Sequence, residues 1–279
     1  MMTSKNTKNY WSMTEGVFNC LIDEKRTKAF IRAIQNTVRP GDVVVDMGTG
    51  SGILAMAAAR AGAGKVFAIE NDPNNLRTLK ETFVSNGVSD TIELIQADAT
   101  KVVLPVKFDV VVAEMIATAL IEELQVPAMN NILQYGNLGS RVVLEQYRIS
   151  ADLVHNRSRY YGFDFEIIRY EYPEDEKLKS RSYSKSIQLA HLDFRNKTEE
   201  YVVEKNIEFQ VNQDGECNAI RLSGKTYFSD GSTLGGTFAY SYPILLPIAK
   251  MRVKKGQLVS AYIKYKISGG MSTLMYKVS

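Results

Sequence analysis

Hydrophobic and polar residues follow two different patterns along this chain, and the change falls near residue 150. From about residue 20 to 150, short runs rich in β-branched residues are separated by longer stretches with helical periodicity. Such alternation is typical of a parallel sheet covered by helices. We predict strands over residues 42–46, 65–70, 91–96, 108–114 and 141–147, and helices over residues 24–38, 53–61, 73–86 and 117–134.

Beyond residue 150 the alternation has a period of two, which is typical of antiparallel strands. It is clearest over residues 201–211, 219–227 and 257–267, with turn-forming sequences at 212–215, 229–232 and 254–256. We therefore predict an α/β fold with a doubly wound, mostly parallel, Rossmann-like sheet, followed by a C-terminal antiparallel, β-rich, barrel-like domain. The predicted parts are an N-terminal helical segment (1–38), an α/β domain (39–150) and a β-rich domain (151–279).

Composition narrows the classes of function. The 279 residues are 45% hydrophobic and 23% charged, and the net charge of +3 is too small to indicate nucleic acid binding by itself. Cys20 and Cys217 lie far apart and only His155 and His191 are present, so we predict neither a metal site nor a histidine-based triad. No stretch approaches about 18 apolar residues and the N-terminus lacks an apolar core. We expect a cytoplasmic protein with no membrane partner.

A glycine-rich turn follows the first predicted strand. The strand ends at Asp46, and Gly48, Gly50 and Gly52 come before the next helix. Glycines allow a tight turn and let a ligand approach the backbone closely. The third glycine comes one residue earlier than in the dinucleotide-binding pattern. This spacing suits a nucleoside that has no pyrophosphate.

Two further acids end the next two predicted strands. Glu70 can accept two hydrogen bonds from ribose hydroxyls, and Asp98, followed by Ala99, is placed to reach an adenine amino group. Open α/β sheets bind ligands at these carboxyl ends of their strands. The whole set resembles the motifs of the class I methyltransferases, which implies S-adenosylmethionine as the cofactor. The residues predicted to bind it on this basis are Asp46, Gly48, Gly50, Gly52, Glu70, Asp98 and Ala99.

The fourth predicted strand places a carboxylate next to the expected position of the methyl group. The strand ends at Glu114, and Glu123 follows nine residues later with Glu122 beside it. Two carboxylates can enclose a guanidinium, whose donors form a fixed fork that matches them. They can draw the positive charge to one side and leave one nitrogen more nucleophilic. We predict Glu114 and Glu123 as catalytic residues, and leave open whether Glu122 takes the second position.

Further motifs make the chain similar to the protein arginine methyltransferases. That family carries two glutamates nine residues apart after the fourth strand, matched here by Glu114 and Glu123. Its aspartate-x-x-arginine-threonine helix is matched by Asp23, Arg26 and Thr27. Less specific matches are Leu-Pro-Val at 104–106, Tyr-Gly-Phe-Asp at 161–164 and Val-Lys-Lys-Gly at 253–256.

The resemblance implies an activity and a division of roles. It implies methyl transfer to a guanidinium nitrogen of arginine in a protein or peptide, with Arg26 paired to the carboxylate of the cofactor. Residues 39–150 would bind S-adenosylmethionine, and residues 151–279 would serve substrate binding and dimerisation. Residues 161–164 match the start of the family's dimerisation arm, so a homodimer is implied.

Departures from the family pattern keep other functions open. The family's tryptophan-methionine-glycine after the first glutamate is Met-Ile-Ala at 115–117 here. Its threonine-histidine-tryptophan loop aligns with Phe-Ala-Tyr at 238–240, which has no histidine, and its paired tyrosines are at best replaced by Tyr10 and Trp11. A small-molecule or RNA acceptor with the same cofactor is the first alternative. A cofactor-binding partner subunit without transfer activity is the second.

Overall fold

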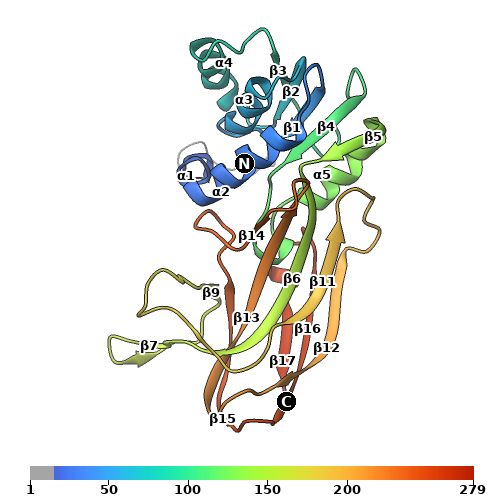
Figure 1. Ribbon diagram of the computed structural model, residues 1–279. Coiled ribbons are helices and arrows are strands. Elements are labelled where there is room, and N and C mark those ends of the chain that lie inside the picture. The colour runs from blue at the N-terminus through green and yellow to red at the C-terminus, as the bar shows by residue number, and fades with distance from the viewer. Residues whose placement is uncertain (1–15) are drawn as a thin grey trace, which may run out of the picture. The chain divides into compact units, whose positions relative to one another are not determined.

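The computed structural model describes residues 16–279, which divide into two compact units (Figure 1). The first unit contains the chain up to Glu114 together with Gln134–Val143. The second contains Met115–Leu133 and Leu144–Ser279. The second unit thus includes a short segment, residues 115–133, that lies in sequence between two strands of the first.

The first unit is built on a five-stranded sheet in the order β3-β2-β1-β4-β5, and all of its strand pairs are parallel. The order reverses next to β1, which makes the carboxyl ends of β1 and β4 a switch point where open α/β sheets bind ligands. Its strands are β1 (Val43–Met47), β2 (Lys65–Glu70), β3 (Ile92–Gln96), β4 (Phe108–Ala113) and β5 (Gly136–Val142). The predicted Rossmann-like fold class is confirmed.

Four helices belong to the described part of the first unit: α1 (Gly16–Ile22), α2 (Glu24–Thr37), α3 (Ile53–Arg60) and α4 (Asn75–Ser85). The side chain of Asp23 caps α2 by accepting a hydrogen bond from the Arg26 N–H at 3.1 Å. Phe30, Ala33 and Ile34 form the buried face of this helix. Within residues 16–279, no helix is long and apolar enough to cross a membrane.

The predicted helix over residues 117–134 is wrong. The segment forms a short 3₁₀ turn, η1 (Thr118–Leu120), then α5 (Gln125–Ile132) and a second turn, η2 (Leu133–Tyr135). Ala119 and Leu120 have left-handed backbones with φ of 58° and 55°, which no α-helix accommodates. The predicted strand over residues 141–147 is likewise split, because β5 ends at Val142 and β6 (Leu144–His155) begins two residues later.

The second unit consists of antiparallel sheets, as predicted. The largest has seven strands, with the path β10-β6-β13-β15-β9 and with β11 and β14 paired to β6 and β13. The others are β12-β16-β17 and the hairpin β7-β8. The bounds are β7 (Arg159–Tyr160), β8 (Phe163–Asp164), β9 (Arg169–Tyr170), β10 (Arg181–Ser182), β11 (Ile187–Asp193), β12 (Val202–Gln210), β13 (Gly215–Phe228), β14 (Thr233–Leu234), β15 (Ile244–Val253), β16 (Leu258–Lys266), η3 (Met271–Thr273) and β17 (Met275–Val278).

The predicted turn sequences have two different roles. Residues 229–232 make the hairpin turn between β13 and β14. Residues 212–215 connect β12 to β13, and residues 254–256 connect β15 to β16. Because each of these two pairs of strands belongs to different sheets, both turns carry the chain from one sheet to another. Alternate side chains of β12, such as Val203, Ile207 and Phe209, are buried, as the period-two pattern predicts.

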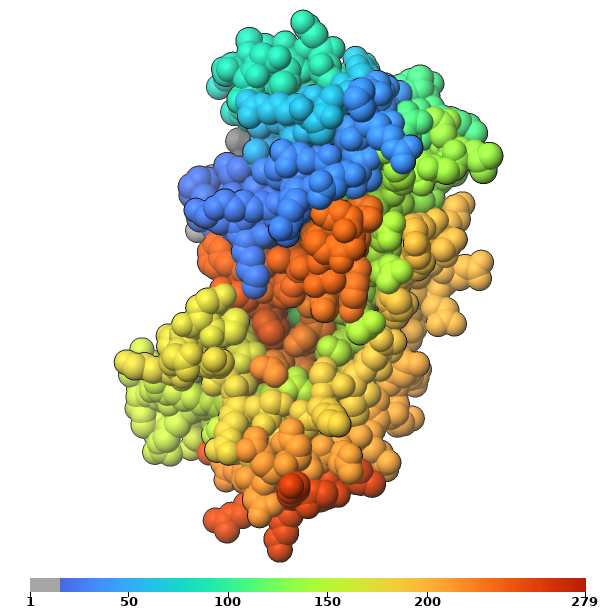
Figure 2. Space-filling model, in the orientation of Figure 1, coloured from blue at the N-terminus to red at the C-terminus, as the bar shows by residue number. Residues whose placement is uncertain are grey.

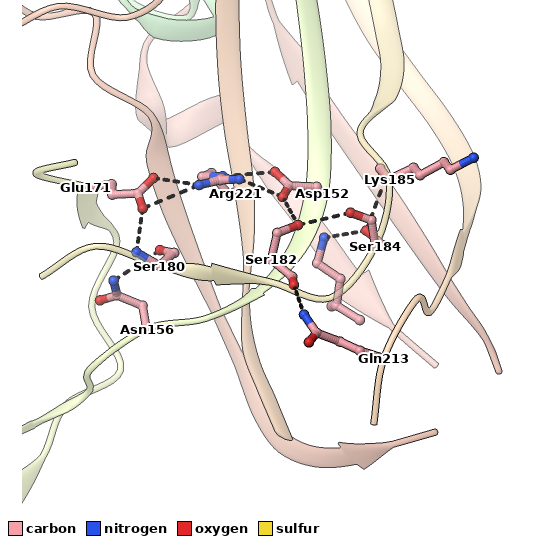
Figure 3. Close-up of polar contacts among 10 residues, drawn as sticks. Asp152, Asn156, Glu171, Ser180, Ser182, Ser184, Lys185, Gln213 and Arg221 are labelled. Carbon is pink, nitrogen blue, oxygen red and sulfur yellow. Dashed lines mark hydrogen bonds and ion pairs between the residues drawn. The ribbon is translucent and has the colours of Figure 1, made fainter. Parts of the chain in front are cut away.

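An ionic network crosses the large sheet of the second unit (Figure 3). Arg221 of β13 lies opposite Asp152 of β6 in register and donates to both of its carboxylate oxygens, at 2.9 and 2.7 Å. On its other side the guanidinium pairs with Glu171 at 3.2 Å. Ser182 donates to Asp152 at 2.7 Å and the N–H of Ser180 donates to Glu171 at 2.6 Å. Both carboxylates are buried, so each depends on the arginine.

Replacing Arg221 should therefore destabilise the protein strongly. An Arg221→Met variant leaves two buried carboxylates without their cation, and we expect the free energy of unfolding to fall by about 3–5 kcal/mol. Arg252 of β15 is exposed, so Arg252→Met is the matched control, with an expected change below about 0.5 kcal/mol. Urea unfolding followed by circular dichroism measures both. Equal stability of the two variants would show that the network contributes little.

Candidate active site

Asp46 lies in β1 just before the glycine-rich turn, and it is almost fully buried. The Thr49 hydroxyl donates to its carboxylate at 2.6 Å. Burial raises the pKa of the Asp46 carboxyl to about 6, although the Thr49 hydrogen bond acts in the opposite direction. The acid predicted from the sequence is therefore a constrained, desolvated group at the carboxyl end of β1. Thr49 is a partner that the sequence analysis missed, although a hydroxyl three residues after the acid was visible in the turn.

The three glycines of the turn all have left-handed backbones, with φ of 65° at Gly48, 54° at Gly50 and 78° at Gly52. A Cβ atom at Gly52 would lie only 2.5 Å from the ring of Phe83 on α4. The third glycine therefore has a packing role: it lets α4 approach the start of α3. A Cβ atom at Gly50 would meet nothing closer than 3.7 Å, so this position is kept for glycine by its backbone conformation.

Glu70, the last residue of β2, holds the glycine turn in place. Its carboxylate accepts hydrogen bonds from the N–H of Gly50 at 3.0 Å and from the N–H of Asp72 at 2.8 Å. Asn75, at the start of α4, donates to the carbonyl of Gly50 at 2.5 Å and lies 3.4 Å from Glu70. Nothing in the sequence pattern distinguished Asn75, because its contacts depend on how α4 returns to the turn.

Asp98 and Ala99 follow β3, which neighbours β2 in the sheet. Asp98 accepts hydrogen bonds from the N–H of Thr100 at 2.9 Å and from its hydroxyl at 2.7 Å. Burial alone would raise the pKa of Asp98, but these hydrogen bonds outweigh it and the pKa is lowered. Asp46, Glu70 and Asp98 thus come from three neighbouring strands of one parallel sheet, as predicted.

Arg26 and Glu114 form an ion pair within the first unit, and each side chain is only 8% exposed. Arg26 lies in the first turn of α2 and also donates to the carbonyl of Cys20 at 2.9 Å. The hydroxyl of Thr27 donates to the same carbonyl at 3.0 Å. Glu114 directly follows β4. The sequence predicts separate roles for these two residues, and the structure brings them together.

Glu123 lies in the second unit, on the segment that follows the strained turn η1. It is partly buried, whereas Glu122 is exposed. Two hydrogen bonds hold the chain around η1. The N–H of Met115 donates to the buried side chain of Gln125 at 2.9 Å, and the hydroxyl of Thr118 donates to the carbonyl of Tyr242 at 2.5 Å. The sequence pattern did not single out these two hydrogen bonds.

Two tyrosines of the second unit are linked to this part of the chain by hydrogen bonds. The carbonyl of Tyr240 accepts hydrogen bonds from the N–H of Thr118 at 3.2 Å and from the hydroxyl of Tyr170 at 3.3 Å. Burial, and then the charge of Glu122, Tyr240 and Glu123, raises the pKa of Tyr170 to about 12. Tyr170 is therefore neutral at physiological pH.

The predicted site residues thus fall into two groups. Arg26, Asp46, the glycines, Glu70, Asp98, Ala99 and Glu114 all belong to the first unit, whereas Glu123 belongs to the second. Joint action of Glu114 and Glu123 stays a prediction. Tyr10 and Trp11 lie outside the described residues.

The donor set of the first unit fits S-adenosylmethionine. A guanidinium at Arg26 can pair with the amino-acid carboxylate of such a molecule, and the Glu70 carboxylate is the acceptor that ribose hydroxyls require. Because the three glycines of the turn have no side chains, a ligand can approach the main chain closely there.

Comparison with known proteins supports this assignment. The sequence model of the ribosomal protein L11 methyltransferase (PrmA) family matches residues 23–149. A protein of Methanocaldococcus jannaschii, named only as uncharacterized protein MJ1452, is 35% identical over 259 residues, which are 92% of this chain and 94% of that protein. An arginine N(omega)-methyltransferase of Streptomyces achromogenes is 36% identical over 123 residues, which are 42% of this chain and 34% of that enzyme.

Among solved structures, protein arginine methyltransferase 10 of Arabidopsis thaliana matches 94% of this chain and 96% of its own, with a TM-score of 0.75 and 16% sequence identity. At that identity the likeness concerns the fold alone. This chain belongs to the class I S-adenosylmethionine-dependent methyltransferases that resemble the protein arginine methyltransferases, in one family with MJ1452.

The raised pKa of Asp46 predicts a pH-dependent loss of stability. The pKa of about 6 in the folded protein exceeds the ordinary value of 3.8, so the folded state keeps a proton that the unfolded state has lost. The free energy of unfolding should therefore fall by about 3 kcal/mol as the pH rises from about 4 to above 6. Urea unfolding without cofactor, compared between the natural protein and Asp46→Asn, isolates this contribution. Identical pH profiles of the two proteins would contradict it.

Proposed function

We propose that this enzyme transfers a methyl group from S-adenosylmethionine to a guanidinium nitrogen of arginine in a protein or peptide. The main support for this proposal is the ion pair between Glu114 and Arg26. The Glu114 carboxylate, at the end of β4, already holds a guanidinium in a buried ion pair, that of Arg26. A carboxylate that binds this group within the chain has the chemistry to bind the same group of a substrate.

The relatives support an arginine acceptor. The similar enzyme of Streptomyces achromogenes is named for arginine, and the Arabidopsis thaliana structure is that of a protein arginine methyltransferase. The PrmA family model points in a second direction, towards a different protein acceptor, but its match ends at residue 149. Most of the second unit lies beyond that residue.

The proposed chemistry needs little beyond binding and charge. The cofactor supplies a methyl carbon bound to a positively charged sulfur. Transfer to a nitrogen would release S-adenosylhomocysteine, and the methylated nitrogen would lose a proton to water. Glu114 and Glu123 would hold the guanidinium so that one nitrogen keeps electron density for the attack.

A labelling experiment tests the acceptor. The full chain is incubated with S-adenosylmethionine that carries a labelled methyl group and with a broad set of arginine-containing peptides, each with a matched peptide in which lysine replaces arginine. We expect label on arginine after hydrolysis and none on the lysine peptides. Label on lysine, on a small molecule or on RNA would contradict the proposal. Tight cofactor binding without transfer to any acceptor would instead indicate a partner subunit.

The two neighbouring acids of the second unit offer a matched pair of variants. Because Glu123 is partly buried and Glu122 is exposed, we expect Glu123→Gln to lower kcat about 100-fold and Glu122→Gln to change it less than about threefold. The affinity for S-adenosylhomocysteine should stay the same in both, since the residues predicted to bind the cofactor belong to the first unit. A larger effect of Glu122→Gln would assign the role to Glu122.

We also propose that the enzyme is a homodimer. The hairpin of β7 and β8 projects from the side of the second unit (Figures 1 and 2), and its tip exposes Tyr161 and Phe163, at 95% and 68%. Large aromatic side chains exposed together mark interaction surfaces.

The dimer is tested by removing these two rings. We expect sedimentation to show a dimer for the natural protein at micromolar concentration and a monomer for the Tyr161→Ser/Phe163→Ser variant. Val84→Ser/Val103→Ser, which removes two other exposed apolar side chains from the first unit, is the control and should remain dimeric. A monomeric natural protein would refute the proposal.

A further inference from the structure

Left-handed backbone is concentrated at one place in the second unit. Among residues 16–279, five residues other than glycine have a positive φ. Four of them, Ala119, Leu120, Tyr240 and Ser268, belong to segments that are hydrogen-bonded to one another. Such conformations persist only where the surrounding structure holds them, and they cluster at functional sites. Two of its members, Ala119 and Leu120, lie just before Glu123 in the chain.

The loop after β16 forms one side of the cluster. The N–H of Ser268 donates to the carbonyl of Leu120 at 2.8 Å, and the N–H of Gly270 donates to the carbonyl of Ile121 at 2.8 Å. The hydroxyl of Ser268 donates to the carbonyl of Glu123 itself at 2.6 Å. Three carbonyls of the segment from 120 to 123 are thus satisfied by a single loop.

The hydroxyl is the only one of these three donors that a side chain supplies. Any residue other than proline has an N–H at position 268, but few side chains short enough to fit can donate to the carbonyl of Glu123. Leu120 and Ile121 are fully buried, so their part of the segment is also fixed by packing. Glu123 is only partly buried, so its backbone depends more on the hydrogen bond from Ser268.

We infer that Ser268 is a positioning residue for methyl transfer: its hydroxyl fixes the backbone of Glu123 and thereby the direction of the Glu123 carboxylate. This inference rests on the proposed role of Glu123 in binding the acceptor. Ser268 touches neither substrate nor cofactor in this account. Its effect on the reaction passes through Glu123, and a displacement of a catalytic group by about 1 Å is enough to slow a reaction severely.

Two variants remove the hydroxyl but differ in backbone strain. Ser268→Ala keeps a Cβ atom at a φ of 54°, whereas Ser268→Gly suits that backbone better than serine does. A loss of activity shared by both therefore does not come from backbone strain at position 268. Ser260, on β16, exchanges backbone hydrogen bonds with Ser279, and Ser260→Ala is the matched control.

Kinetics with the acceptor that takes label test the inference. We expect both Ser268 variants to lower kcat about tenfold, with unchanged affinity for S-adenosylhomocysteine and with Ser260→Ala as active as the natural protein. In a Glu123→Gln background, Ser268→Ala should cause no further loss, because its effect passes through the missing carboxylate.

Two results would overturn the inference alone: full activity of both Ser268 variants while Glu123→Gln is impaired, or losses that multiply in the double variant. Full activity of Glu123→Gln would be different, because it would remove the proposed acceptor site and the role of Ser268 with it.

Discussion

The buried ion pair between Arg26 and Glu114 is the interaction on which the proposed cofactor and acceptor sites both depend. Both side chains are 8% exposed, and a charge so placed is costly unless it has an opposite partner. The pair links the first turn of α2 to the end of β4, so it joins the residue predicted to hold the cofactor's carboxylate to the residue predicted to hold the acceptor. If a carboxylate of the ligand pairs with Arg26, the buried Glu114 then requires another cation. A guanidinium from a substrate satisfies that requirement.

The second unit contributes a different kind of constraint. Glu123 follows a turn whose backbone is left-handed at Ala119 and Leu120, two fully buried residues. This conformation is sterically unfavourable for residues that have a Cβ atom. Hydrogen bonds hold this turn from two sides. Thr118 donates to the carbonyls of Tyr240 and Tyr242. Ser268, in the loop after β16, donates to the carbonyls of Leu120 and Glu123. The aligned family histidine is absent at 238–240, yet the backbone of this loop still supports the acidic segment.

The sequence predicted the parts of the fold that depend on local pattern. The bounds of β2 were predicted residue for residue, and the acids and glycines at the strand ends lie where a parallel sheet places them. The turn at 118–120 could not be predicted, because it contains neither glycine nor proline and its apolar residues fit a helical pattern. Its conformation is set by hydrogen bonds to residues 240, 242 and 268, more than 100 positions away in the chain. The ion pair of Arg26 with Glu114 is equally non-local, since 88 positions separate its partners.

The most direct test of the central claim is a crystal structure with S-adenosylhomocysteine and an arginine-containing peptide bound. We expect Arg26 to contact the carboxylate of S-adenosylhomocysteine and the guanidinium of the peptide to lie against Glu114. An Arg26 side chain that remains on Glu114, with the peptide arginine bound elsewhere, would contradict it.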